Sequence, residues 1–141
     1  MESIFGKQGF KLVALVWEKV QKQEALNEFE GMLAAAMKEH PEFAFFWDLG
    51  EVMARPQEIN GTVVNPLVHT GLHLVVERQL HHDDPEEARA VLQHLQSKGT
   101  PRHEALHSIA QAWGEIYFRS IRRGNPMEEL SYVEVLRSLL P

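Results

Sequence analysis

The sequence predicts an all-α fold, a single-domain bundle of five to six helices over residues 1–141. Three observations support this. Apolar residues recur at spacings of three and four along most of the chain, as on one face of a helix. Proline and glycine stand at the expected helix boundaries. The alternation typical of strands is missing, and Thr62-Val63-Val64 is the single short extended candidate.

The first two helices are predicted from their apolar faces. One helix spans about residues 8–22, and the other runs from about Ala25 to Glu39 and ends where His40 precedes Pro41. A short helical turn over Phe43–Trp47 should fill the core. An irregular connection through Arg55-Pro56 and Asn60-Gly61 follows it. The expected inward residues are Phe10, Val13, Val16, Trp17 and Val20, then Leu26, Phe29, Leu33, Ala36 and Met37.

The next helix carries two histidines. Asn65 suits its N-cap and Pro66 its first position, and the helix should reach His82. His69 and His73 are four residues apart, so they share one face at the border of the apolar arc. Thr70 should lie further round, towards the polar side.

Three more helices complete the prediction. Asp84 caps the first of them, which ends at about Ser97 before Lys98-Gly99. Thr100-Pro101 opens a long helix to about Arg123, and Asn125-Pro126 opens the last one. Leu130, Val133, Leu136 and Leu140 are expected to face inward on the last helix.

Composition excludes several classes of function. The chain has no cysteine, so disulfides, thiolate nucleophiles and cysteine metal sites are ruled out, and any metal would need His and carboxylate ligands. The net charge of −6 argues against a nucleic-acid surface, and Arg119, Arg122 and Arg123 are interpreted as cations at a helix C-terminus. No apolar run is long enough for a membrane span, so we expect a cytoplasmic protein.

The histidines are the best candidates for a functional site. If the helix with His69 and His73, the helix after it and the helix with His103 and His107 run up, down and up, both histidine pairs share one end of the bundle. His40 joins them if the second helix of the chain is antiparallel to the helix with His69. Glu115 could supply a carboxylate. Such a cluster predicts a divalent metal such as zinc, nickel or iron bound by neutral imidazoles. A catalytic metal there would favour hydrolysis by an activated water, which leaves open whether the protein is an enzyme.

Two alternatives remain open. The histidines could hydrogen-bond within the core of a non-catalytic protein whose apolar surplus, including Phe45, Phe46 and Trp47, binds a partner or a second copy of itself. A minor alternative is a zinc metallopeptidase, because residues 103–107 match the HExxH pattern. Pro101 places His103 in the first turn of its helix, however, and no sheet is predicted beside it.

Nearly the whole chain resembles a family of small, helical, mainly proteobacterial proteins grouped as a domain of unknown function. The most specific shared piece is Asn-Pro-x-x-His-x-Gly-x-His over residues 65–73. The other shared pieces are Trp17-Glu18-Lys19, Glu39-His40-Pro41-Glu42-Phe43, Asp83-x-Pro85, His107 with Glu115, and Tyr132-x2-Val135-Leu136. No activity follows from the resemblance.

The resemblance does sort the histidines. His40, His69, His73 and His107 fall on positions that resemble the family's own, whereas His103-Glu104 do not, so the HExxH match is interpreted as accidental. We therefore predict that these four histidines bind the metal, with Glu115 or water completing the shell. Arg78 and Gln111 stand where the family tends to have acids. Substrate, partner and oligomeric state do not follow from the sequence.

Overall fold

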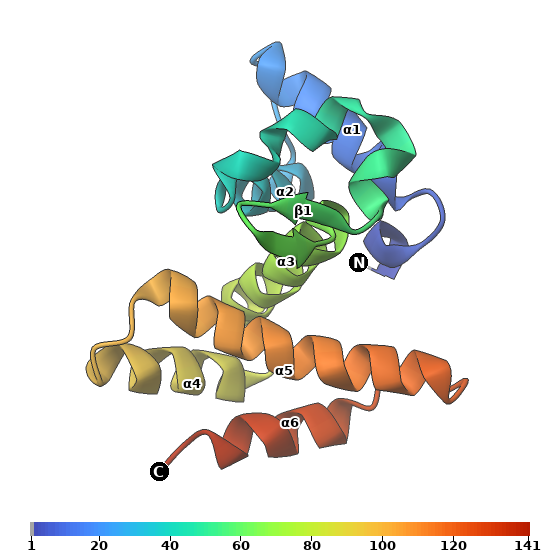
Figure 1. The fold of residues 1–141 in the computed structure, drawn as a ribbon. Coiled ribbons are helices and arrows are strands. Elements are labelled where there is room, and N and C mark those ends of the chain that lie inside the picture. Colours follow the sequence, from blue (N-terminus) through green and yellow to red (C-terminus); the bar gives the residue numbers. More distant parts are fainter. Residues whose placement is uncertain (1) are drawn as a thin grey trace. The chain divides into compact units, whose positions relative to one another are not determined.

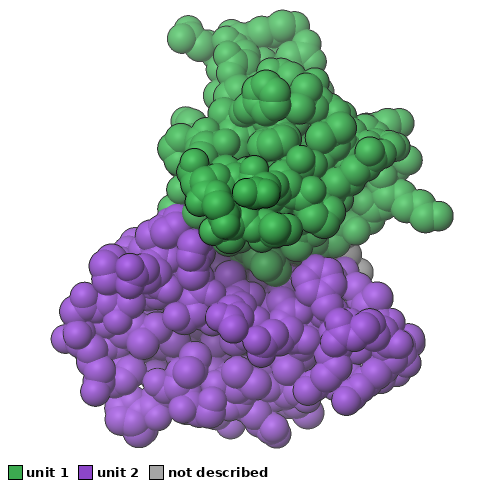
Figure 2. All heavy atoms as spheres, viewed as in Figure 1, with its two compact units in different colours: residues 1–74 green, residues 75–141 purple. Residues whose placement is uncertain are grey.

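The computed structural model describes residues 2–141 and confirms the all-α class (Figure 1). In that range the α-helices are α1 (Gly9–Gln21), α2 (Glu28–Lys38), α3 (Pro66–His82), α4 (Glu86–Ser97), α5 (Arg102–Arg122) and α6 (Glu129–Ser138). Short 3₁₀ helices are η1 (Glu2–Phe5), η2 (Pro41–Asp48) and η3 (Gly50–Ala54). The chain forms two compact units, which meet in sequence between Leu74 and Val75, within α3 (Figure 2).

The first unit packs α1 and α2 against the 3₁₀ helices. Val13, Val16 and Leu33 are fully buried, as the apolar spacing predicted. The segment predicted to fill the core is η2, and its Phe43 and Trp47 are buried. Phe45 points outward instead and is 72% exposed, so only part of this aromatic run belongs to the core.

Helix α2 begins three residues later than predicted because Asn27 caps it. The Asn27 Oδ1 accepts the Glu30 N–H at 2.8 Å, and the Glu30 carboxylate accepts the Asn27 N–H at 3.0 Å. This reciprocal capping box satisfies two backbone donors that the helix itself leaves open. Lys19 of α1 also donates to Glu30 at 2.7 Å, which ties α2 to α1.

The connection before α3 is more regular than predicted. Strands β1 (Gln57–Ile59) and β2 (Thr62–Val64) pair antiparallel, with Ile59 opposite Thr62. Asn60 and Gly61 between them have φ of 53° and 82°, the conformation of a two-residue type I′ turn. The irregular loop expected here is therefore a β-hairpin, and Asn60-Gly61 was the signal for it.

The second unit contains α4, α5 and α6, which pack on one another. Its core includes Val91, Ile109, Tyr132 and Leu136, all fully buried. The prediction for α6 was wrong at Leu130, which is 81% exposed. Leu136 is fully buried as predicted, and Tyr132, four residues before it on the same face of the helix, is buried with it in place of Leu130.

The start of α4 also differs from the prediction. Pro85, not Asp84, is the N-cap, and no side chain caps the helix. Its φ and ψ of −75° and 150° are extended, as is usual for the residue before a helix. Glu86 and Glu87 in the first turn place negative charge near the positive helix end.

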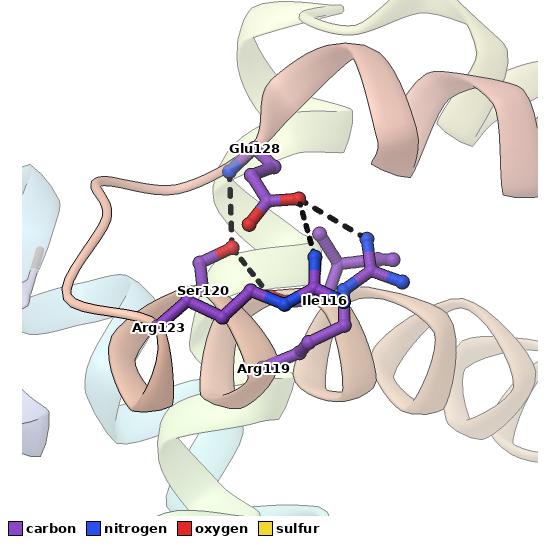
Figure 3. A network of polar contacts seen from close by, with 5 residues as sticks. All are labelled: Ile116, Arg119, Ser120, Arg123 and Glu128. Atoms are coloured by element: carbon purple, nitrogen blue, oxygen red, sulfur yellow. Dashed lines mark hydrogen bonds and ion pairs between the residues drawn. The ribbon is translucent and has the colours of Figure 1, made fainter.

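A polar network closes the turn between α5 and α6 (Figure 3). The buried Ser120 hydroxyl donates to the Ile116 carbonyl at 2.7 Å and accepts the Glu128 N–H at 3.2 Å. The Glu128 Oε1 lies 3.2 Å from Arg119 and 3.6 Å from Arg123. Two of the three arginines interpreted as helix-end cations are thus paired with a carboxylate, which reduces the positive charge of this patch.

Tyr132→Phe is expected to lower the free energy of unfolding by about 1 kcal/mol, because the change removes one hydrogen bond and leaves the packing in place. The fully buried Tyr132 hydroxyl donates to the Gln79 Oε1 at 2.6 Å. Burial raises the pKa of the Tyr132 phenol, so the hydroxyl keeps its proton at neutral pH. Urea denaturation measures the change. An unaltered midpoint in urea would show that the bond adds no stability.

Candidate metal centre

Helix α3 holds His69 and His73 at the predicted spacing. The Asn65 Oδ1 accepts the Val68 N–H at 3.0 Å, which confirms Asn65 as the N-cap. The two imidazole centroids lie 5.1 Å apart, with the rings inclined at 61°. His73 is almost completely buried, and Thr70, expected on the polar side, is buried as well. The histidine face of α3 is therefore a buried face of the helix.

His40 joins this pair from the segment between α2 and η2. Its Nε2 lies 2.9 Å from the Nε2 of His69. Its ring centroid is 5.3 Å from that of His73, and a ligand nitrogen of each lies within 4.8 Å of the other. The structure thus brings together three of the predicted ligands in the first unit. They are His40 and, 29 and 33 positions further along the chain, His69 and His73.

Glu42 selects the tautomer of a neutral His40 ring. One oxygen of its carboxylate, Oε2, lies 2.9 Å from the His40 Nδ1. An ionised carboxylate only accepts hydrogen bonds, so Nδ1 carries the proton and a neutral ring keeps its lone pair on Nε2. That nitrogen is the one turned towards His69. A carboxylate behind a metal-binding imidazole is a common outer-shell arrangement, and the sequence pattern alone does not predict it for Glu42.

The spacing of the two Nε2 atoms suits a shared metal ion. Tetrahedral zinc binds imidazole nitrogens at about 2.0–2.1 Å, which places two such nitrogens roughly 3.3 Å apart. The observed 2.9 Å would need to widen by only about 0.4 Å. In the absence of an ion the same distance is a hydrogen bond, with His69 donating to His40, so the geometry accommodates either state.

Apolar groups cover this site on one side. The Phe43 ring stacks on His40 with centroids 4.8 Å apart and meets His69 edge-on at 5.7 Å. Such a wall limits access of water and strengthens the electrostatic interactions behind it. The His40 side chain itself is 15% exposed, so an ion could still reach the ring.

Gly71 lies between the two histidines because η1 packs closely against α3. A Cβ at this position would come within 2.7 Å of Cε1 and 2.9 Å of Cζ of Phe5. The glycine of the Asn-Pro-x-x-His-x-Gly-x-His motif therefore has a packing role, which brings the aromatic ring onto the helix backbone next to the histidines.

The remaining predicted ligands lie in the second unit, on α5. His103, set aside by the sequence analysis, stands beside His107 with ring centroids 4.3 Å apart. Glu115 accepts a hydrogen bond from Gln111 at 3.2 Å and is exposed. Eight residues separate it from His107, which is about 12 Å along a helix axis. Glu115 as a ligand of the same ion stays a prediction, whereas the Glu42 carboxylate contacts the His40 ring directly.

The metallopeptidase pattern does not gain support. His103 is the second residue of α5, in the first turn as predicted, and Glu104 is exposed. Between Val75 and Pro141 the described secondary structure is helical, without the sheet that holds substrate in such enzymes.

The fold and the histidine cluster define a small all-α protein with a candidate metal centre. The chain belongs to the family described as a domain of unknown function, DUF1841, whose sequence model matches residues 7–138. No curated protein and no solved structure shows a significant match. None of the helices in residues 2–141 combines the length and apolar character that a membrane crossing requires.

Proposed function

We propose that this protein binds a divalent metal ion, either zinc, nickel or iron, through neutral imidazole nitrogens of His40, His69 and His73. The main support is the approach of the His40 and His69 Nε2 atoms to 2.9 Å, with Glu42 behind the His40 Nδ1. Imidazole ligands suit these three metals, whereas magnesium and calcium favour oxygen ligands.

We include His107 in the proposal as a fourth ligand. The order of the helices in the sequence supports it, since His69, His73 and His107 all stand in the first two turns of their helices. His103 offers a second nitrogen, and the ligand nitrogens of His103 and His107 lie within 4.8 Å of one another. Water would occupy any coordination position that these side chains leave open.

Metal content tests the proposal. Protein without a His tag, loaded with zinc and then desalted, should retain roughly one ion per chain when analysed by mass spectrometry. His69→Ala should lose the ion, because the change removes the Nε2 atom that faces the Nε2 of His40. His82→Ala is the matched control, since His82 is exposed at the end of α3. Retention of the full metal content by His69→Ala would rule out the proposed ligand set.

The His107→Ala variant separates the parts of the proposal. Four-ligand binding predicts that His107→Ala weakens zinc affinity as strongly as His73→Ala does. An unchanged affinity would remove His107 and leave a site made by the first unit. His103→Ala in parallel shows whether the neighbouring ring replaces it.

The second candidate function is a non-catalytic interaction protein with hydrogen-bonded histidines. The 2.9 Å contact between His40 and His69 fits this alternative without any metal. Phe45 and Leu49 supply exposed apolar surface in the first unit, whereas Trp47 is buried and is removed from the predicted partner surface. Metal content well below one ion per chain, together with binding to a second copy or a partner that Phe45→Ser removes, would favour it.

A further inference from the structure

We propose that a groove in the first unit binds a small apolar anion, meaning a molecule with an aromatic or short aliphatic body and one carboxylate or sulfonate. The groove has a volume of about 460 Å³ and lies between α1, α2 and η2. This size falls within the range of small-molecule pockets. The inference does not depend on the metal proposal.

The body of the ligand would be held by apolar side chains. Trp17 and Trp47 line the groove together with Met37 and Pro41. The Trp17 indole offers a flat surface for stacking, whereas Trp47 and Met37 are buried and border the groove from the core side. Trp17 is only partly buried, so part of its ring surface is available to a ligand.

The positive charge at the edge of the groove favours an anionic ligand. Lys38 is the one charged residue among the described residues that line the groove, and it is exposed. Within residues 2–141 it forms no ion pair. The C-terminal ends of α1 and α2 disfavour an anion, because helix C-termini are negative, but each carries only about half an elementary charge. Their effect is reduced further because backbone N–H groups already bond the Lys19, Val20 and Ala36 carbonyls.

Gln23 gives independent support, because it occupies a position that favours glycine. It follows α1 with φ of 56°, and it donates to the Val20 carbonyl while Glu24 donates to Lys19, the pattern of a Schellman motif. Gly99 takes this place after α4. A non-glycine residue here is strained, and Gln23 lines the groove together with Gln21. Strain retained at a groove points to use of the side chain.

Two probes with one ring system test the proposal. Metal-free protein is titrated with 8-anilinonaphthalene-1-sulfonate and with the uncharged N-phenyl-1-naphthylamine. We expect saturable one-to-one binding, tighter for the sulfonate. Lys38→Gln should weaken sulfonate binding about fivefold, as for one partly exposed ion pair, and leave the uncharged probe unaffected. Lys11→Gln is the matched control, since Lys11 is exposed on α1 outside the groove.

Two further variants locate the probe. Ala44→Leu fills the groove and should weaken both probes at least tenfold. Gln23→Gly should raise the midpoint of urea denaturation, because glycine relieves the strain, and should weaken sulfonate binding. Equal affinity of the two probes, or no effect of either Lys38→Gln or Ala44→Leu in variants with native circular dichroism, would overturn the proposal. Unchanged sulfonate affinity in Gln23→Gly would remove Gln23 from it.

Discussion

Gly9→Ala is expected to lower the free energy of unfolding by about 2–4 kcal/mol. A Cβ at Gly9, the first residue of α1, would lie 1.9 Å from the carbonyl oxygen of Ile4 and 2.7 Å from its carbonyl carbon. The clash is with backbone, so no rotamer change relieves it. The cheapest response is displacement of η1, which withdraws the fully buried Ile4 from the core. Loss of one buried aliphatic side chain sets the expected magnitude.

Gly31→Ala is the matched control for that experiment. Gly31 lies inside α2, and an added Cβ there meets nothing within 4 Å. Alanine should therefore raise the free energy of unfolding by about 0.5–1 kcal/mol, because it has the higher helix propensity. Opposite signs in urea denaturation would identify contact with η1 as the cause. Equal destabilisation of both variants would contradict this explanation.

Local signals predicted much of the fold because they act within a few residues. Asn65 caps α3 through a bond to Val68, three positions away, and residue patterns report such contacts directly. The burial of Phe43 was predicted equally well. Leu130 was misplaced because α6 has two apolar faces at helical spacing, and tertiary packing chooses between them.

The candidate site was predicted in part for the same reason. The separation of His69 and His73 is a property of one helix, and His40 was expected near them from the order of helices. Glu42 was missed because residues two apart do not face each other on an α-helix. Here His40 precedes the 3₁₀ helix η2, with φ of −129°, and the turn brings the Glu42 carboxylate back to its Nδ1. Both residues are visible in the sequence, but the backbone conformation that brings their side chains together is not predicted by residue spacing.

Zinc is expected to raise the free energy of unfolding of the wild-type protein by about 2.7 kcal/mol when its free concentration is 100 times the dissociation constant. The proposed site lies in the folded first unit, where His40, His69 and His73 are already assembled, so an ion bound there would gain little from the unfolded chain. Denaturation in urea with chelator-buffered zinc measures the increment. His40→Ala should abolish it, because the Nε2 that faces His69 is removed.

Glu42→Gln gives the sharper result, because it keeps the shape of the side chain. The amide oxygen can still accept the His40 Nδ1 proton, but the negative charge behind the imidazole is lost. Loss of such an outer-shell partner weakens metal binding about 10–100-fold, so the increment at the same free zinc should fall to about 0.4–1.4 kcal/mol. Hydrogen-bonded histidines without a metal site predict instead that Glu42→Gln changes stability equally with and without zinc. A zinc increment that is the same in wild type, Glu42→Gln and His40→Ala would place any bound zinc elsewhere.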